Sequence, residues 1–456
     1  MKLFSTRTVL LLSLAACGVP VLGVGCSASA PAPAENVGAA AAALASSTNP
    51  PGGLQPSQVP QFVAVTFDDN FSTEGMDWAT GFFRGLRNPA GSGNPSTFDG
   101  APVRTTFPCN SVYLGGMQGS WETGVADGHE IANHTVNHGD GIAYTADQWS
   151  PEIAECTSAL VSGLSTPGNP LHVTGFRSPY LHYDDALFTV LVNDGFAYDT
   201  SIMGCWADAQ TGKSCTWPYT MENGSPDANT IFTKFSGRNV AAVGNHAIWE
   251  MPVAVVFVPD DSLAAQYGFT AGLRQRVANA VAGEGNPNFF EQATGKFVGM
   301  DISLLLDGKM THAEALATLE YTLDLRLAGN RAPMIFVAHT HVYASAWDGN
   351  APGAQNAADR RAIVEDFVRY ALTKPEVRMR PVADVLAWMK SPAALGACTP
   401  TTCAAQGRTC GSISDGCGAT LACGTCAAGK TCSSAGTCQA CVPTTCSAQA
   451  ATCGSI

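Results

Sequence analysis

The stretch Phe62-Val-Ala-Val-Thr-Phe-Asp68-Asp69 is a short apolar run that ends on two adjacent carboxylates. A run of this length and composition predicts a buried strand. Further strands are expected at 173–176, 246–258 and 334–338. Helical patterns lie between these segments, so the sequence favours an α/β fold with a mainly parallel sheet or barrel. Such folds place their sites beyond the C-terminal ends of the strands.

The clearest helix begins at Thr311, because Glu314 three residues later completes a capping-box pattern. Leucines then repeat on one face, at positions 316, 319, 323 and 327. A second helix is expected from Asp184 to Gly195, since a glycine commonly ends a helix.

The chain has 456 residues, 46% hydrophobic and 13% charged, so it can bury one large core and a smaller module. Its formal net charge is −13, and Lys and Arg are not clustered. This balance argues against a nucleic-acid or anionic-lipid partner, because phosphate binding needs clustered positive charge. A neutral or cationic partner fits better.

Residues 1–26 are typical of an export signal, in which Lys2 and Arg7 accompany an apolar stretch, 9–16, that is too short to span a bilayer. We therefore expect a secreted, periplasmic or cell-surface protein without a transmembrane span. Leu-Ala-Ala-Cys17 resembles a lipobox, so lipidation of Cys17 is an alternative to simple secretion. Residues 27–60, rich in Ala, Pro and Ser, predict a linker before a folded domain at 61–390.

Residues 397–456 contain eleven cysteines among small residues, so disulfides must supply the stability of this module. The segment repeats with an offset of 43 residues, because Cys398-Thr-Pro-Thr-Thr-Cys403 recurs as Cys441-Val-Pro-Thr-Thr-Cys446. The first copy has eight cysteines, enough for four bridges, whereas the second has three and is interpreted as truncated. Substrate attachment, surface display and a plain spacer are all possible roles.

Asp68 and Asp69 leave one backbone turn in different directions, so one can bind a metal ion while the other takes a proton. An Asp pair alone is more often a solvated turn or a helix cap. His134 and His138 lie four residues apart, and a single helical turn would bring both imidazoles onto one face, as zinc requires. Together with Asp69 they form a His, His, Asp set with open positions for water, as expected of a catalytic zinc site.

Three further motifs follow predicted strands, namely Arg177-Ser-Pro179-Tyr180, Tyr198-Asp199-Thr-Ser and Val337-Ala-His339-Thr-His341. Their order and content, with the two motifs above, resemble the polysaccharide deacetylase family (NodB homology, carbohydrate esterase family 4) over residues 61–390. The resemblance implies a (β/α) barrel, distorted and seven-stranded, which is followed here by the small disulfide-rich repeat module.

The resemblance implies that Asp69, His134 and His138 hold a divalent ion, with zinc as the default and cobalt as an alternative. It makes Asp68 the general base on a water activated by that ion. Arg177 would pair with Asp68 and hold it ionised. The structural alternative for Arg177 is a surface ion pair.

The same resemblance assigns stabilisation of the oxyanion in part to the backbone N–H of Tyr180. It makes His339 the acid that protonates the departing amine, with Asp199 as the partner that favours its imidazolium form. His341 is a rival acid. A core histidine that caps a strand is the structural alternative for His339.

Animal-type chitin deacetylases contain stretches similar to Gly128-His-Glu-Ile-Ala, Trp217-Pro-Tyr-Thr-Met221 and His246-Ala-Ile-Trp-Glu-Met251. The implied reaction is hydrolysis of N-acetyl groups on a chitin-like polysaccharide by a monomeric enzyme. Alternatives are N-acetyl groups of peptidoglycan, O-acetyl groups of xylan, or a non-catalytic glycan-binding adhesion protein. Ile202-Met203 and Val337 depart from the family pattern, which puts the shape of the acetyl pocket in doubt.

Trp217, Tyr180, Trp249 and Trp347 are candidates to stack against sugar faces, although each is more often a packing residue. Cys205 and Cys215 flank a short loop and are expected to form a disulfide. Cys109 and Cys156 are the other pair in this domain, and either a second disulfide or two free thiols fit the sequence.

Overall fold

The structure is a computed structural model that describes residues 43–228, 243–347, 349, 356–396, 401–414, 420–433 and 435–440. The predicted export signal, Cys17 and the first part of the predicted linker lie outside the described residues. Among the helices in these ranges, none is both long enough and apolar enough to cross a lipid bilayer.

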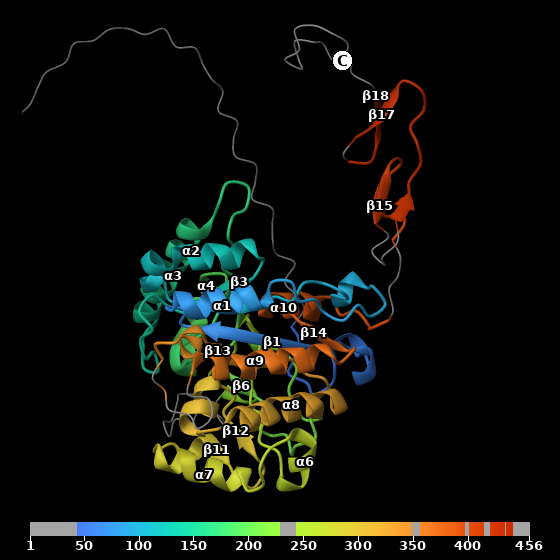
Figure 1. The fold of residues 1–456 in the computed structure, drawn as a ribbon. Helices are drawn as coiled ribbons and strands as arrows, with labels where there is room; N and C mark the ends of the chain where they lie inside the picture. Colours follow the sequence, from blue (N-terminus) through green and yellow to red (C-terminus); the bar gives the residue numbers. More distant parts are fainter. Residues whose placement is uncertain are drawn as a thin grey trace, which may run out of the picture. The chain divides into compact units, whose positions relative to one another are not determined.

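The central strand of the main sheet is β1 (Gln61–Asp68), which lies beside β13 (Met334–His339) in Figure 1. It is buried along its whole length, and its neighbour on the other side is β2 (Thr106–Cys109). The other strands of this sheet are β3 (Glu130–Asn133), β4 (Gly175–Phe176), β5 (Tyr198–Asp199), β6 (Met203–Gly204), β7 (Tyr219–Thr220), β8 (Trp249–Glu250), β9 (Val253–Ala254) and β14 (Val377–Met379).

The strand order is β6-β9-β13-β1-β2-β3-β4-β5-β8-β7, and β14 pairs with β1 beside this path. Every pairing is parallel except that between β7 and β8. The predicted α/β class is therefore confirmed, as a curled sheet that forms part of a barrel. The sheet has eleven strands in the described residues, because several two-residue strands extend the seven that were expected.

Of the strands predicted from the sequence, β1 and β13 match closely, while the segment 246–258 is divided among three short strands. These are β8, β9 and β10 (Val256–Phe257). Pro252 lies between the first two and cannot donate a ladder hydrogen bond, which explains the division. The third strand belongs to a separate antiparallel sheet with β12 (Lys296–Phe297) and β11 (Phe290–Glu291).

The helices that follow these strands are α1 (Thr73–Phe83), α2 (Leu114–Ala126), α3 (Ala146–Leu164), α4 (Asp185–Asn193), α6 (Ala264–Tyr267), α7 (Leu273–Gly283), α8 (His312–Ala328), α9 (Ala357–Leu372) and α10 (Val382–Lys390). Helix α8 has the predicted capping box between Thr311 and Glu314. Helix α4 is capped by Asp184 and ends two residues before Gly195, which has a φ of 76°.

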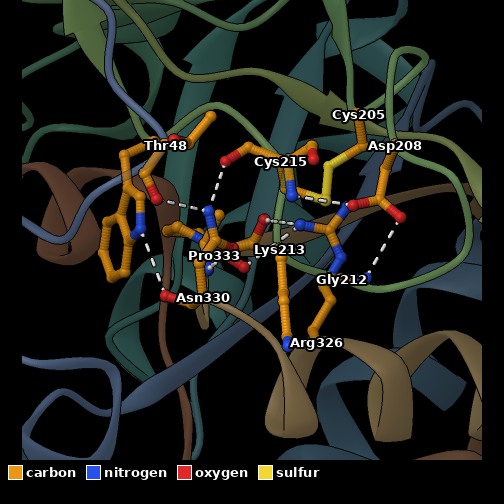
Figure 2. Close-up of a disulfide and its surroundings, with 12 residues drawn as sticks. Thr48, Cys205, Asp208, Gly212, Lys213, Cys215, Arg326, Asn330 and Pro333 are labelled. Atoms are coloured by element: carbon orange, nitrogen blue, oxygen red, sulfur yellow. Dashed lines mark hydrogen bonds between the residues drawn. A yellow bond between two sulfur atoms is a disulfide. The ribbon is translucent and has the colours of Figure 1, made fainter.

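The second half of the predicted linker, residues 43–60, is part of the folded domain, so this prediction is wrong. Leu44 and Thr220 exchange backbone and side-chain hydrogen bonds of 2.9 and 3.0 Å. The carbonyl of Thr48 accepts a 2.7 Å bond from Asn330 (Figure 2). Backbone groups make these contacts, which explains why an Ala, Pro and Ser composition gave no sign of them.

The expected disulfide between Cys205 and Cys215 is confirmed, and Figure 2 shows it beside Asn330. The amide of Asn330 also donates to the carbonyl of Cys215 at 2.6 Å, which ties this loop to the segment before β13. Cys109 and Cys156 are buried free thiols, so the second disulfide is not formed.

The C-terminal module contains two hairpins, β15 (Ser412–Ser414) with β16 (Thr420–Ala422) and β17 (Lys430–Cys432) with β18 (Cys438–Ala440). Three disulfides connect it, at 403 to 423, 410 to 432 and 426 to 438. These bridges confirm a disulfide-rich module. Cys398, Cys417 and the cysteines of the second repeat lie outside the described residues.

Candidate active site

The predicted site residues gather at the C-terminal ends of adjacent parallel strands. Asp68, the last residue of β1, lies beside His339, the last residue of β13, in the sheet register. His134 directly follows β3, and Arg177 directly follows β4. Residues far apart in the chain therefore meet at one edge of the sheet, as the strand order predicts.

Asp69, His134 and His138 form a candidate metal site in which the three ligand atoms all lie within 4.8 Å of one another. Oδ1 of Asp69 is 3.0 Å from Nε2 of His138 and 3.4 Å from Nε2 of His134. Nδ1 of His134 lies 2.7 Å from the carbonyl of Arg177, so Nδ1 carries the proton and Nε2 presents a lone pair. Oδ1 of Asp69 is buried and has no hydrogen-bond donor among the residues that the structure describes.

One carboxylate oxygen and two imidazole nitrogens converge here at distances that a single ion can bridge, so this donor set fits a divalent ion. The second group of potential ligands, Cys410, Cys426 and Cys432, does not, because all three sulfurs are in disulfides.

The segment that carries the two histidines is a loop, so the predicted helical turn is wrong. Thr135 and His138 have left-handed backbones, with φ of 67° and 55°. The carboxylate of Glu152 accepts the N–H groups of Val136 and Asn137 at 3.0 and 2.9 Å, which replaces the bonds of a helix. The imidazoles still converge, with ring centroids 5.0 Å apart.

Arg177 pairs with Asp68, as the sequence predicts, through a 2.7 Å contact from Nη1 to Oδ1. The guanidinium is completely buried, which excludes the alternative of a surface ion pair. Its Nε donates to the carbonyl of Thr200 at 2.9 Å, and Nη1 also reaches the hydroxyl of Thr66 at 2.5 Å. These bonds fix the guanidinium, which in turn orients one oxygen of Asp68.

The partner of His339 is Asp301, so the prediction that Asp199 fills this place is wrong. Nδ1 of His339 lies 2.7 Å from Oδ1 of Asp301, and the backbone N–H of His339 donates to Oδ2 at 2.8 Å. Burial lowers the pKa of His339, but the charge and hydrogen bond of Asp301 outweigh burial and raise the pKa to about 9. Asp301 therefore favours the imidazolium form of His339.

Asp199 is instead held by Ser201, whose hydroxyl and N–H donate to its two oxygens at 2.8 and 2.9 Å. Burial raises the pKa of Asp199, and burial together with the charge of Asp199 raises the pKa of Glu250 well above its ordinary value. Oε2 of Glu250 has no donor among the described residues. The neutral form of Glu250 is therefore favoured beside the carboxylate of Asp199.

Asp301 is the site residue that the sequence analysis missed. It follows an apolar stretch, 297–300, and an isolated bridge between Met300 and Val337 places it beside the end of β13. An acidic residue directly after an apolar stretch was the available signal, the same one that marks Asp68. The stretch is too short to be recognised as a strand by composition.

Tyr180 and His341 also border the candidate metal site. Tyr180 is 58% exposed, has a left-handed backbone with φ of 58°, and its ring lies 4.7 Å from that of His138. Nδ1 of His341 lies 3.7 Å from Oδ2 of Asp69 and has no hydrogen-bond partner among the residues described.

The three candidate tryptophans do not lie open to a sugar. Trp217 and Trp249 are 1% and 6% exposed and are packing residues. Trp347 is half-buried under the guanidinium of Arg360, 4.7 Å from its ring centroid.

Comparison with known proteins agrees with this assembly. The family described as polysaccharide deacetylase matches residues 96–198, which include His134, His138, Arg177 and Tyr180. Chitin deacetylase 1 of Bombyx mori is 26% identical over 244 residues, 52% of this chain and 41% of that protein. Chitin deacetylase 8 of Bombyx mori is 28% identical over 190 residues, 40% of this chain and 44% of that protein. The chain thus spans less than half the length of these curated relatives.

A crystal structure from Mycobacterium smegmatis, assigned as a polysaccharide deacetylase, aligns at a TM-score of 0.45 and 16% identity over 78% of this chain and 99% of that chain. The family match and the two curated relatives show that this chain is similar to polysaccharide deacetylases, with residues 96–198 matching the family itself.

Proposed function

We propose that this protein removes N-acetyl groups from a chitin-like N-acetylglucosamine polysaccharide and releases acetate. The observation that carries the proposal is the grouping, at one sheet edge, of a candidate metal site, an oriented carboxylate and an imidazole held by a second carboxylate. The similarity of about half the chain to proteins named chitin deacetylases supports the substrate class.

Asp69, His134 and His138 would hold the ion, with zinc as the first candidate and cobalt as the second. A divalent ion supplies polarisation of the acetyl carbonyl and acidity to a water molecule. These three side chains bring one negative charge, so a dication at this place keeps a net positive charge for a developing oxyanion.

Asp68 would act as the general base. Its carboxylate is held by Arg177 at 2.7 Å, which leaves the remaining oxygen to accept a proton from the attacking water. The new bond forms between the water oxygen and the acetyl carbon. The backbone N–H of Tyr180 would donate to the oxyanion that results.

His339 would act as the general acid, because its imidazolium can transfer a proton from Nε2 to the departing nitrogen as the carbon–nitrogen bond breaks. Asp301 keeps Nδ1 occupied and favours the charged form. The products are acetate and a free amino group. Asp199 would support Arg177 from behind, as part of the buried pair with Glu250.

We also propose that the enzyme is a monomer that works outside the cytoplasm, secreted or attached to the cell surface, with Cys17 as a possible lipid anchor. The disulfides of both the main domain and the C-terminal module fit an oxidising compartment. The repeat module would attach the enzyme to its substrate or display it.

Acetate release from chitin oligomers tests the proposal. We expect activity in the metal-loaded full chain, loss after chelation, and recovery with zinc or cobalt. Asp68→Asn should lower the rate by about a hundredfold or more. Asp194→Asn, which neutralises an exposed carboxylate at the end of α4, is the matched control and should leave the rate unchanged.

Two other outcomes would change the assignment. Release of acetate from acetylated xylan or peptidoglycan, with chitin oligomers intact, would preserve the chemistry and overturn the substrate. A folded, metal-loaded protein that leaves all three polymers intact would favour the non-catalytic glycan binder.

A further inference from the structure

The exposed large hydrophobic side chains of this protein gather beside the candidate active site. In the part of the chain that the structure describes, they are Phe71 at 43%, Val112 at 54%, Tyr113 at 39% and Tyr180 at 58% exposure. Phe71 follows the Asp68-Asp69 turn, and Val112 and Tyr113 form η4 (Ser111–Tyr113) after β2. We call Phe71 and Tyr113 the aromatic platform.

The aromatic platform is joined to the metal site through His341. The rings of Phe71 and Tyr113 have centroids 5.2 Å apart. The imidazole of His341 stacks on Phe71, with centroids 4.5 Å apart and planes 16° apart, and its Nδ1 lies 3.7 Å from Oδ2 of Asp69. One imidazole ring therefore separates the platform from a candidate metal ligand.

The two oxygens of Asp69 face different neighbours. Oδ1 faces His138, whose ring contacts Tyr180, whereas Oδ2 faces His341 and then Phe71. The candidate metal site consequently has an exposed aromatic ring on each side of Asp69, namely Tyr180 on the side of Oδ1 and Phe71 on the side of Oδ2. The aromatic platform is the larger of the two apolar surfaces, because it contains two rings.

The segments that carry the platform are held firmly to the metal site. The side-chain amide of Asn70 donates to the carbonyls of Phe67 and Pro108 at 2.6 and 2.7 Å, which fixes the turn before Phe71. The N–H groups of Ser111 and Val112 donate at 3.3 and 3.2 Å to the carbonyls of Thr135 and Val136, in the loop between the two histidines. The rings are thus positioned before any ligand binds.

We propose that the aromatic platform is a subsite that stacks against a pyranose ring of the polysaccharide, next to the unit that loses its acetyl group. This inference rests on the proposed function and deepens it, since it assigns the substrate contact. The ring of a β-linked amino sugar offers a C–H face that packs on flat aromatic rings. Such packing removes the apolar surface of the exposed aromatic pair from water, which favours binding. A neutral sugar also suits a chain of net charge −13 better than an anionic ligand.

Binding without turnover tests the subsite. The full chain with Asp68→Asn is titrated with the disaccharide and the tetramer of N-acetylglucosamine in a calorimeter. Adding Phe71→Ala or Tyr113→Ala should weaken binding of the tetramer by about three- to tenfold each, with a smaller effect on the disaccharide.

Variants that keep the aromatic ring and variants that remove it distinguish stacking from a general apolar contact. Tyr113→Phe and Phe71→Tyr should retain the affinity for the tetramer, whereas Phe71→Leu should lose it as Phe71→Ala does. Both positions are exposed, so equal melting temperatures are expected and should be checked for all variants.

Unchanged tetramer affinity in the two alanine variants would overturn the subsite, as would an Asp68→Asn parent that does not bind the tetramer. These outcomes are distinct from failure of the proposed function, which is measured separately as acetate release by the wild-type chain. If wild type releases acetate while the alanine variants bind like their parent, the enzyme assignment stands and only the platform is wrong.

Discussion

Replacing Asp301 with Asn tests how the protein sets the charge of His339. The two side chains are 2.7 Å apart and both are buried. Burial alone would lower the pKa of His339, but Asp301, with smaller contributions from Asp69 and Asp68, raises it from 6.5 to about 9. This interval corresponds to about 3 kcal/mol of interaction that favours the imidazolium form.

In the metal-free protein, we expect Asp301→Asn to lower the pKa of His339 well below 9, because only the weaker influence of Asp69 and Asp68 then offsets burial. A raised pKa in the folded state stabilises the protein fully below pH 6.5, and this contribution disappears as the pH rises through about 9. Asp301→Asn should therefore cost about 3 kcal/mol of unfolding free energy at pH 6, and less at pH 9.5.

The assay is an NMR titration of the imidazole of His339 in chelated protein, combined with urea unfolding at the two pH values. Asp199→Asn is the matched control, since Asp199 is also a buried carboxylate and was the partner expected from the sequence. It should leave the pKa of His339 near 9. A pKa that stays near 9 in Asp301→Asn, or falls in Asp199→Asn instead, would refute the reasoning.

Substitutions at three further residues address the buried titratable groups. Glu250→Gln should retain stability within about 1 kcal/mol in urea unfolding, because an amide can still donate to Asp199, whereas Glu250→Ala should cost about 3 kcal/mol. The N–H of Thr105 donates to Nδ1 of His129, and burial lowers the pKa of His129 to about 4, so this histidine must stay neutral when folded. Wild type should then lose about 2 kcal/mol more than His129→Gln between pH 7 and pH 5, since the unfolded histidine takes up a proton first. Arg177→Lys should lower the melting temperature and cost about 3 kcal/mol or more, because a lysine cannot reach Asp68 and the carbonyl of Thr200 together.

The sequence predicted those parts of the site in which the functional side chain lies directly at the end of a recognisable strand. Asp68 and His339 end strands whose apolar composition is obvious, so both the strand and its terminal side chain could be found. Arg177 was placed correctly against Asp68 through the resemblance to the deacetylase motifs. In these cases the motif and the strand that presents it are continuous in the chain.

The partner of His339 could not be found in this way. Asp199 and Asp301 both follow short apolar stretches, and only the bridge between Met300 and Val337 decides which of them reaches β13. That bridge consists of a single residue pair, and no periodic pattern in the sequence predicts it. The same limit explains residues 43–60, where the contacts are made by backbone atoms that composition does not reveal.

The loop between His134 and His138 shows why the remaining geometry escaped prediction. Spacing of four residues fits a helix, but buried asparagines at the strand ends supply other bonds. The amide of Asn133 donates to the carbonyl of Ile153 at 2.8 Å, and its oxygen accepts the N–H of Thr135 at 2.8 Å. Asn110 donates to the carbonyl of His134.

These side chains take over the hydrogen bonding that a helix would otherwise provide, and they allow left-handed backbone conformations in the motif loops. Residues in that conformation gather here, namely Asp69, Asn70, Thr135, His138, Tyr180 and Leu181. Such conformations cost about 1 kcal/mol or more each and persist only where surrounding bonds hold them. Predictions from local sequence patterns therefore fail at the positions where the metal ligands and the exposed rings meet. These loops need backbone conformations that regular helices and strands do not provide.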